Sequence, residues 1–314
     1  MSGVAVEFET LKALPDMPAQ SPGSRAWRRF RRNRLAMASA VFLGLLVAVM
    51  LLTLPWTQAR FDQQDLSANR QPPSLAHPAG LDTLGRDLVH RCLFGGVISI
   101  GVGLGAAAIS VTVGVLWGAI AALAGGRVDT AMMRLVDILY GLPYILLVIL
   151  MKVAFERPLT QLIQDKQIAN LVILFVAIGS VSWLTMARVI RGQVLSLRET
   201  PFVEAARAAG AGPLRILRRH LLPNLVGPIV VYATMTVPQA ILQESFLSFL
   251  GIGVAPPIPT WGSLAAEGVA AINTVVSFWW MLLYPCLFLG ATLLALNFMG
   301  DGLRDAFDPR TGKG

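Results

Sequence analysis

Residues 204–224 read EAARAAGAGPLRILRRHLLPN, a basic stretch that separates two long apolar segments. Pro201, shortly before it, can begin a helix, because proline fits the first helical turn. Glu204 falls in that first turn, where a carboxylate is favoured by the positive end of the helix dipole. Gly210 can adopt the left-handed conformation that ends a helix, and Pro213 can begin another. The sequence therefore predicts two short helices joined by a glycine turn.

The second of these helices carries an apolar stripe made by Leu214, Leu217 and Leu221, with arginines on its other faces. Isolated helices shorter than about 12 residues are marginal in water, so the stripe must pack on something. Two interpretations remain open from the residues alone. Either the segment lies on the lipid surface and its arginines only set topology, or it docks on another protein.

The composition indicates an integral membrane protein. The chain of 314 residues is 55% hydrophobic and 14% charged, whereas a soluble domain carries about a quarter charged residues. The formal net charge is +8, but the arginines cluster beside apolar segments, which favours a role in topology over a nucleic-acid partner. Cys92 and Cys286 lack any disulfide or zinc spacing, and the histidines are scattered, so we expect no metal site.

Six apolar segments are long enough to cross about 30 Å of hydrocarbon. Backbone polar groups in lipid must pair within their own segment, so the segments are predicted to be helices and the fold to be all-α. In the second segment, Gly101 with Gly105 and Gly114 with Gly118 allow close approach of a neighbouring helix. The six predicted spans are 35–54, 96–124, 131–154, 169–190, 223–248 and 275–299.

The distribution of Lys and Arg predicts that both termini lie in the cytoplasm, because cytoplasmic loops carry an excess of positive charge. Arg86 and Arg91 fit this pattern least well, since they fall on the outer side. We expect 155–168 to be a charged loop between spans, and 249–274 to be a proline-rich surface or re-entrant turn. The predicted regions are a cytoplasmic tail (1–34), a first span (35–54), an extracytoplasmic loop or subdomain (55–95), a core of five spans (96–299) that includes the cytoplasmic segment 191–222, and a cytoplasmic tail (300–314).

The opening stretch resembles the EAA loop of binding-protein-dependent ABC importer permeases. That pattern has Glu-Ala-Ala, then Gly, then Leu-Pro, and this chain supplies these residues at the same spacing, with His220 where the family has Ile. In the family, this loop docks into a groove on a cytoplasmic ATPase. The resemblance therefore implies that 191–222 is a coupling segment, with the ATPase-coupling residues Glu204, Ala205, Ala206, Gly210, Pro213, Leu214, Leu217, Leu222 and Pro223.

The resemblance extends from about Arg25 to Arg310. The stretches HPAGLDTLGRD (77–87), ESFLSFLGIGV (244–254) and GDGLRDAFDPR (300–310) are similar to dipeptide and oligopeptide permeases, most of all to the C-type subunit of oligopeptide importers. The resemblance implies the type I ABC importer permease fold with six transmembrane helices. Against that pattern, 155–168 is an insertion or a lengthened loop.

Catalytic motifs are absent from the sequence. There is no G-x-x-x-x-G-K-[ST] loop to cradle phosphates, nor an HExxH or GxSxG arrangement, so we expect no enzyme activity in this chain. Asp137 and Glu244 fall within predicted spans, where an unpaired charge is costly, and each is a candidate for translocation or gating. Helix-end packing or a satisfied ion pair is the other interpretation of both.

The resemblance implies a transmembrane subunit of an ATP-driven oligopeptide importer in the bacterial inner membrane. Its partners would be a homologous second permease, two cytoplasmic ABC ATPases that bind ATP and Mg, an extracytoplasmic peptide-binding protein and the lipid bilayer. The chain itself would bind no cofactor. Dipeptides, nickel chelates or other small peptide-like solutes are alternative cargoes. An ion-coupled secondary transporter is the alternative of a different class, although such proteins often place charged groups near the midplane, and mid-span charges are few here.

Overall fold

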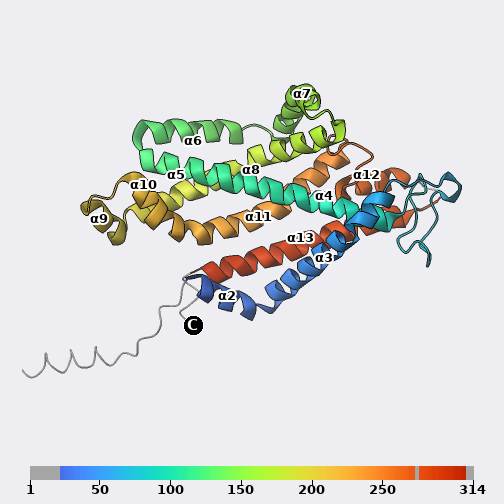
Figure 1. The fold of residues 1–314 in the computed structure, drawn as a ribbon, viewed down its shortest axis with the longest axis horizontal. Helices are drawn as coiled ribbons and strands as arrows, with labels where there is room; N and C mark the ends of the chain where they lie inside the picture. The colour runs from blue at the N-terminus through green and yellow to red at the C-terminus, as the bar shows by residue number, and fades with distance from the viewer. Residues whose placement is uncertain (1–21, 273–275, 309–314) are drawn as a thin grey trace, which may run out of the picture.

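The computed structural model describes residues 22–272 and 276–308, and in these residues the regular elements are helices, apart from one isolated bridge between Leu81 and Asp87 (Figure 1). The all-α expectation is confirmed. The predicted tails are only partly described, because 1–21 and 309–314 lie outside these ranges, as does residue 275, where the sixth span was expected to begin.

In the described part of the chain, five helical rods are long and apolar enough to cross a membrane, and a bent pair of helices makes six if it counts as one span. Two of them have 37 residues, or roughly 55 Å at 1.5 Å per residue, so they extend well beyond the hydrocarbon. This is why the predicted spans are too short: hydropathy marks only the part inside lipid. The rods are α3 (Arg34–Arg60); α4 (Leu88–Ile109) with the π-helical turn η2 (Ser110–Gly114) and α5 (Val115–Ala124); α8 (Lys166–Arg198); α10 (Pro213–Ile216) with the π-helical turn η3 (Leu217–Leu221) and α11 (Leu222–Phe249); and α13 (Trp279–Phe307).

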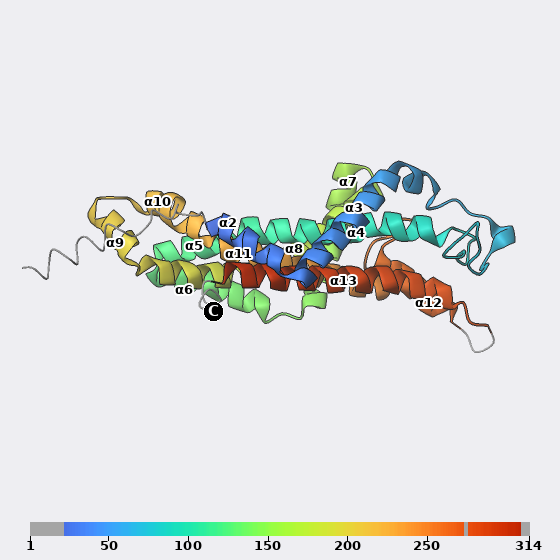
Figure 2. The same cartoon turned by 90° about the horizontal axis from the view of Figure 1, so that it is seen from below.

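The predicted span 131–154 is not one straight helix. It divides into α6 (Gly126–Tyr140) and α7 (Tyr144–Ile163), which meet at 94°. Pro143 precedes α7, and the residue before a proline is pushed out of the helical region, so the rod breaks there. Figure 2 shows α6 alongside the bundle and α7 standing out from it. The expectation of a loop over 155–168 was also wrong, because α7 continues to Ile163 and a short connection leads into α8, whereas an insertion relative to the family stays a prediction.

The segment 249–274 contains a helix, α12 (Trp261–Ala271), that the turn prediction missed. Thr260 and Ser263 form a capping box at its start, in which each side chain bonds the backbone N–H of the other residue. α12 packs against α13, α11 and α4. In the described loop between the end of α3 and the start of α4, the one helical element is a 3-10 turn, η1 (Leu66–Ala68).

The helical rods run along the long axis of the molecule and give it two distinct ends (Figure 1). α2 (Pro22–Arg32), α9 (Pro201–Ala208), α10 and the last turns of α13 lie toward one end. The polar loop after α3 and the helix α12 lie at the other. The first and last helices of the described chain therefore reach toward the same end as α9 and α10.

The α5 rod packs closely on α8 through glycines. A Cβ at Gly118 would lie 2.4 Å from the carbonyl oxygen of Ala187, and one at Gly114 would lie 2.6 Å from Met186 Cβ. No side chain fits at either position without separating the helices. The predicted close approach at this glycine pair is confirmed.

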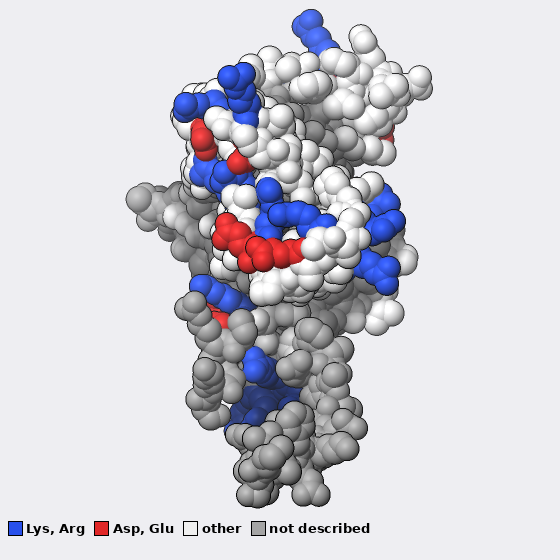
Figure 3. Space-filling view, turned by 90° about the vertical axis from the view of Figure 1, so that its left-hand side faces the viewer, with Lys and Arg blue, Asp and Glu red and all other residues white. Residues whose placement is uncertain are grey.

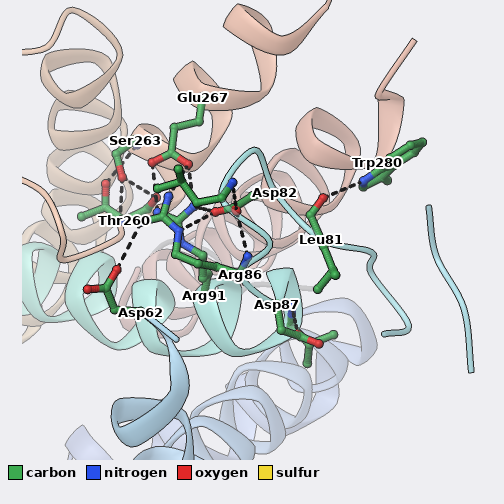
Figure 4. A network of polar contacts seen from close by, with 12 residues as sticks. Asp62, Leu81, Asp82, Arg86, Asp87, Arg91, Thr260, Ser263, Glu267 and Trp280 are labelled. Carbon is green, nitrogen blue, oxygen red and sulfur yellow. Dashed lines mark hydrogen bonds and ion pairs between the residues drawn. The ribbon is translucent and has the colours of Figure 1, made fainter. Parts of the chain in front are cut away.

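A network of ion pairs joins the loop between α3 and α4, here called the outer loop, to α4 and α12 (Figure 4). It lies at the end of the molecule opposite α9 (Figure 1). Asp82 is fully buried, and one of its carboxylate oxygens accepts from Arg86 Nε at 2.7 Å and from Arg91 Nη1 at 2.6 Å. Arg91 also donates to both carboxylate oxygens of Glu267, at 2.5 and 3.0 Å. The two arginines that fitted the charge pattern least well are thus neutralised by acids at that end.

We expect Gly118→Ala to lower the unfolding temperature of the detergent-solubilised protein by roughly 5 °C or more, because the added Cβ pushes α5 away from α8. Gly192→Ala is the matched control: its added Cβ meets open space within a helix, so it should leave the temperature unchanged or raise it. Equal melting temperatures for Gly118→Ala and the wild type would contradict the packing described.

We expect Asp82→Asn to destabilise the protein far more than Asp62→Asn. The first change leaves the buried Arg86 and Arg91 without their shared carboxylate, and breaking a buried pair costs about 3–5 kcal/mol. Asp62 is 39% exposed and makes one contact, 3.3 Å from Arg86, so its loss should cost about 0–1 kcal/mol. Denaturant unfolding of both variants measures the difference, and similar losses would refute a role for Asp82 at the centre of the network.

Candidate functional site: the segment between α8 and α11

The segment that links α8 to α11 begins with the short helix α9 and a glycine turn, as predicted. The second short helix is not separate, however, because α10 and η3 continue into α11 as one rod from Pro213 to Phe249. The π-helical turn η3 lies directly before Pro223, and such local adjustments let a helix continue past the missing N–H of proline. The predicted helix boundary at Pro223 is therefore wrong, and the segment is joined rigidly to a span.

The turn after α9 is a Schellman motif. Gly210 N–H donates to the carbonyl of Arg207 at 3.0 Å, and Ala211 N–H donates to the carbonyl of Ala206 at 3.0 Å. Gly210 has φ +81°, a conformation that costs other residues about 1–2 kcal/mol. Gly212 has an ordinary backbone conformation with φ −69°. Gly210 is thus the residue on which the direction of the turn depends.

The inner face of the segment packs on the bundle through one apolar cluster, here called the seat. Val203, Leu221 and Leu225 are fully buried, in one apolar cluster with residues of α5 and α8. Burying a Leu or Val side chain contributes about 1.5–3 kcal/mol, so this seat fixes α9 and the α10–α11 rod to the rods of α5 and α8. The α5 and α8 residues of the cluster are Val115, Ala119, Ala122, Met186, Ile190 and Val194.

The outer face presents polar and basic groups together with two large apolar side chains. Leu214 is 57% exposed and Phe202 43% exposed, and Glu204 and Ala205 are exposed between them along α9 and α10. Figure 3 looks at this end of the molecule and shows Lys and Arg side chains around it, with a smaller group of Asp and Glu. A shallow hollow of about 460 Å³ lies at the turn, lined by Gly210, Gly212, Pro213, Leu214, Arg215 and Arg218.

The residues predicted for coupling fall into three groups, buried, half-buried and exposed. Leu217 is buried in the bundle, so it cannot face a docked partner as expected; it belongs to the seat instead. Ala206 and Leu222 are half-buried. The exposed members, which stay candidates for contact, are Glu204, Ala205, Gly210, Pro213, Leu214 and Pro223.

Glu244 lies near the opposite end of α11 and is fully buried. Ser248 Oγ donates to it at 2.6 Å and Ser99 Oγ, from α4, at 3.3 Å. Ser99 Oγ in turn accepts from the backbone N–H of Trp261 at the start of α12, at 3.2 Å. Glu244 therefore lies at the junction of three helices, and its proposed part in translocation stays a prediction.

Asp137 pairs with Arg188 of α8 at 2.9 Å, and both side chains are well exposed. The Arg188 guanidinium also lies 4.2 Å from the centre of the Tyr140 ring. Asp137 lies in the last turn of α6, close to the break between α6 and α7. The satisfied ion pair was the alternative interpretation of this residue, and a direct part in translocation stays a prediction.

A polar stripe on α11 was missed by the sequence analysis. Tyr232, Thr236, Gln239 and Gln243 follow one another at helical spacing and line one wall of a pocket of about 350 Å³. Tyr144, where α7 begins, also lines this pocket. The spacing of four and three residues within an apolar span was the available signal.

Comparison with known proteins places the chain in a family. The family model described as "Binding-protein-dependent transport system inner membrane component" matches residues 114–313, and the model "N-terminal TM domain of oligopeptide transport permease C" matches residues 21–73. The OppC oligopeptide permease of Escherichia coli K12 is 43% identical over 96% of this chain and 96% of its own length. The DppC dipeptide permease of Bacillus subtilis is 42% identical over 93% of this chain and 87% of its own length.

A solved structure shares the fold. A chain of the inward-facing MetNI methionine ABC transporter aligns with TM-score 0.55 at 18% identity, over 69% of this chain and 96% of that one. At this identity the likeness concerns the fold alone. Together with the two family models and the two relatives, it shows that the chain belongs to the inner-membrane components of binding-protein-dependent transport systems, as a C-type permease of the ABC importers.

Proposed function

We propose that this chain is the transmembrane subunit of an ATP-driven importer of oligopeptides, and that α9 and the following turn dock on a cytoplasmic ATPase. Its membership of the permease family and the names of its relatives, which include oligopeptide and dipeptide permeases, support the class of cargo. The docking role rests on the fact that the two faces of the segment differ. The inner face packs on the bundle through the apolar seat, whereas Glu204 and Leu214 are exposed on the outer face.

The proposed assembly has four further proteins. A second permease would complete the path, two ABC ATPases would bind ATP and Mg below, and a soluble binding protein would deliver peptide from outside. The end that carries α2, α9 and the last turns of α13 would face the cytoplasm, because it holds the main clusters of arginine. The chain would be a multi-pass protein of the bacterial inner membrane.

The geometry supports a direct route from the ATPases to the path. α10, η3 and α11 form one rod, so a displacement at the turn moves the wall of the polar pocket on α11. The seat on α5 and α8 makes those rods follow. Nucleotide can shift the equilibrium between inward and outward states only by binding one state more tightly, and the docked turn is where such a difference would act.

The function is tested by purifying the complex from membranes and reconstituting it in liposomes with its co-purifying ATPases and binding protein. We expect uptake of short peptides that requires ATP hydrolysis and persists without an ion gradient. Uptake that continues after ATP depletion and collapses with the ion gradient would contradict the proposal and favour a secondary transporter. Comparing a dipeptide, a longer peptide and a nickel chelate identifies the cargo.

We expect Glu204→Lys to reduce ATP-dependent uptake by at least about tenfold with no change in melting temperature. The side chain is exposed and makes no ion pair within the described residues, so the fold does not need it, whereas a charge reversal on a docking face is costly. Glu199→Lys is the control, an equal charge change at an exposed position between α8 and α9. Uptake equal to the wild type at matched membrane levels would argue against docking through α9.

We expect Gly210→Ala to weaken co-purification of the ATPases, because alanine strains the left-handed turn by about 1–2 kcal/mol and re-aims α9. Gly212→Ala should have no effect, since its φ is −69° and its surroundings are open. The amount of ATPase retained on the purified permease measures both. Equal retention in the two variants would show that the direction of the turn does not matter for docking.

A further inference from the structure

The helix α2 has one apolar face, and the protein itself covers that face. Ala26 and Phe30, four residues apart, are buried in one apolar cluster with residues of α3 and α13. The Arg29 side chain also donates from Nη1 to the backbone carbonyl oxygen of Asp308, just after α13, at 2.9 Å. The helix is therefore held on the bundle, and its opposite face has a fixed direction.

The opposite face of α2, here called the basic face, is exposed and positively charged. With 3.6 residues per turn, it consists of Trp27, Arg28, Arg31 and Arg32. Trp27 is 59% exposed, and the three arginines are exposed as well. These arginines form no ion pair within residues 22–272 and 276–308. The basic face is thus not used to hold the described part of the fold together.

Arg34 places a further cation at the border of the hydrocarbon. It is the first residue of α3, and it shares one face of that helix with Leu45 and Leu52, because 11 and 18 residues are close to three and five full turns. Both leucines are exposed, and α3 is the least buried of the five candidate spans in the described residues. That face is therefore turned to lipid, with Arg34 at its end.

The start of α3 favours an anion from outside the described residues. Its first turn has no acidic residue, and a cation such as Arg34 is unfavourable beside the positive end of a helix dipole. The Asn33 side chain caps the helix by accepting from the backbone N–H of Ala36 at 3.1 Å, but it supplies no charge. The corner formed by α2, the start of α3 and the end of α13 has more arginines than aspartates. They are Arg28, Arg29, Arg31, Arg32, Arg34 and Arg304 against Asp301, Asp305 and Asp308.

The head groups of anionic phospholipids match this corner in charge and in position. Their phosphates lie where the lipid-facing side of α3 ends, and they accept strong, often bidentate hydrogen bonds from guanidinium groups. Indole rings such as that of Trp27 favour the same head-group region. We propose that the basic face of α2, together with Arg34, binds anionic phospholipids of the cytoplasmic leaflet. The proposal rests on the proposed orientation of the permease and does not depend on the cargo.

An acidic surface on an ATPase is the other partner with the right charge, and the position of α2 favours lipid over it. α2 packs on α13 and on α3, the least buried span. The proposed ATPase contact is carried instead by α9 and α10, which join α8 to α11. Figure 1 shows α2 beside α3 and α13, apart from α9 and α10.

Lipid bound at this corner would hold the neighbours of the α11 rod at the membrane surface. A Cβ at Gly302 of α13 would lie 2.2 Å from Ala36 Cβ, so α13 and α3 are in close contact here. A Cβ at Gly227 of α11 would lie 3.1 Å from the Phe307 ring of α13. The rod proposed to move therefore touches an element that the lipid contact anchors.

The test uses the complete complex in phosphatidylcholine liposomes that contain a trace of a photoreactive lipid. One probe is phosphatidylglycerol with the reactive group near its head group, and the other is phosphatidylcholine of the same design. Mass spectrometry measures the ratio of the two labellings in residues 22–35. The variants are Arg31→Gln with Arg32→Gln, and Arg31→Lys with Arg32→Lys. The control is Arg127→Gln with Arg134→Gln, which removes two exposed arginines of α6.

We expect the wild type to be labelled by the anionic probe about tenfold more than by the neutral one, since each arginine near an anionic head group strengthens binding about fivefold. The Gln variant should lower this ratio at least about fivefold. The Lys variant should keep most of it, because the charge is retained, and the control should match the wild type. Raising the salt concentration should lower the wild-type ratio, because exposed charges are screened.

Several results would overturn the proposal. A wild-type ratio near one, or a ratio that salt does not change, would show that the basic face does not select anionic lipid. An equal loss in the control variant would show that any arginine at this end acts in the same way. Crosslinks from residues 22–35 to an ATPase in place of lipid would identify the other partner.

Two further measurements keep the outcomes separate. Membrane levels of each variant show whether it inserts, and if the Gln variant does not, the Lys variant and the salt series on the wild type decide the result. Uptake of a short peptide with ATP is measured in the same liposomes. Absent uptake with the labelling ratio intact would count against the proposed function and leave the lipid site standing.

Discussion

The apolar seat beneath the α9 turn is the contact on which the account of this permease depends. Leu221 and Leu225 are fully buried against Met186 and Ile190 of α8 and against α5. Without this seat, α9 would be a helix of 8 residues with nothing to pack on, and such short helices are marginal in water. With it, the turn is fixed to the end of a 37-residue rod, and its outward face has a defined direction.

The other end of the molecule is held by buried polar contacts in addition to apolar packing. Asp82, Arg91 and Glu267 join the outer loop to α4 and α12, and Glu244 joins α4, α11 and α12 through hydroxyl groups. Apolar packing at one end and buried polar groups at the other leave the pocket on α11 between two anchored regions. A rod anchored in this way moves as a unit, which is what transmission from an ATPase to the path requires.

Much of this structure could be predicted from the sequence, because lipid forces long apolar runs to be helices. The same rule explains the errors. Hydropathy averaged over 131–154 hid the break that Pro143 causes. It could not detect α12 either, because that helix is too short to be recognised as a membrane span. The turn at Gly210 was predictable from local chemistry. The burial of Leu217 and the pocket beside the polar stripe that ends at Gln243 depend on contacts between helices that are far apart in the sequence. A single sequence does not show which helices make those contacts.

The central claim is that the exposed face beside Gly210 contacts a cytoplasmic ATPase. The most direct measurement replaces Leu214, which is 57% exposed, by the photo-crosslinking residue benzoylphenylalanine and irradiates intact cells that express the whole importer. The account predicts one main crosslinked product, containing this chain and a nucleotide-binding subunit. Crosslinks to lipid alone, or to the extracytoplasmic binding protein, would contradict it.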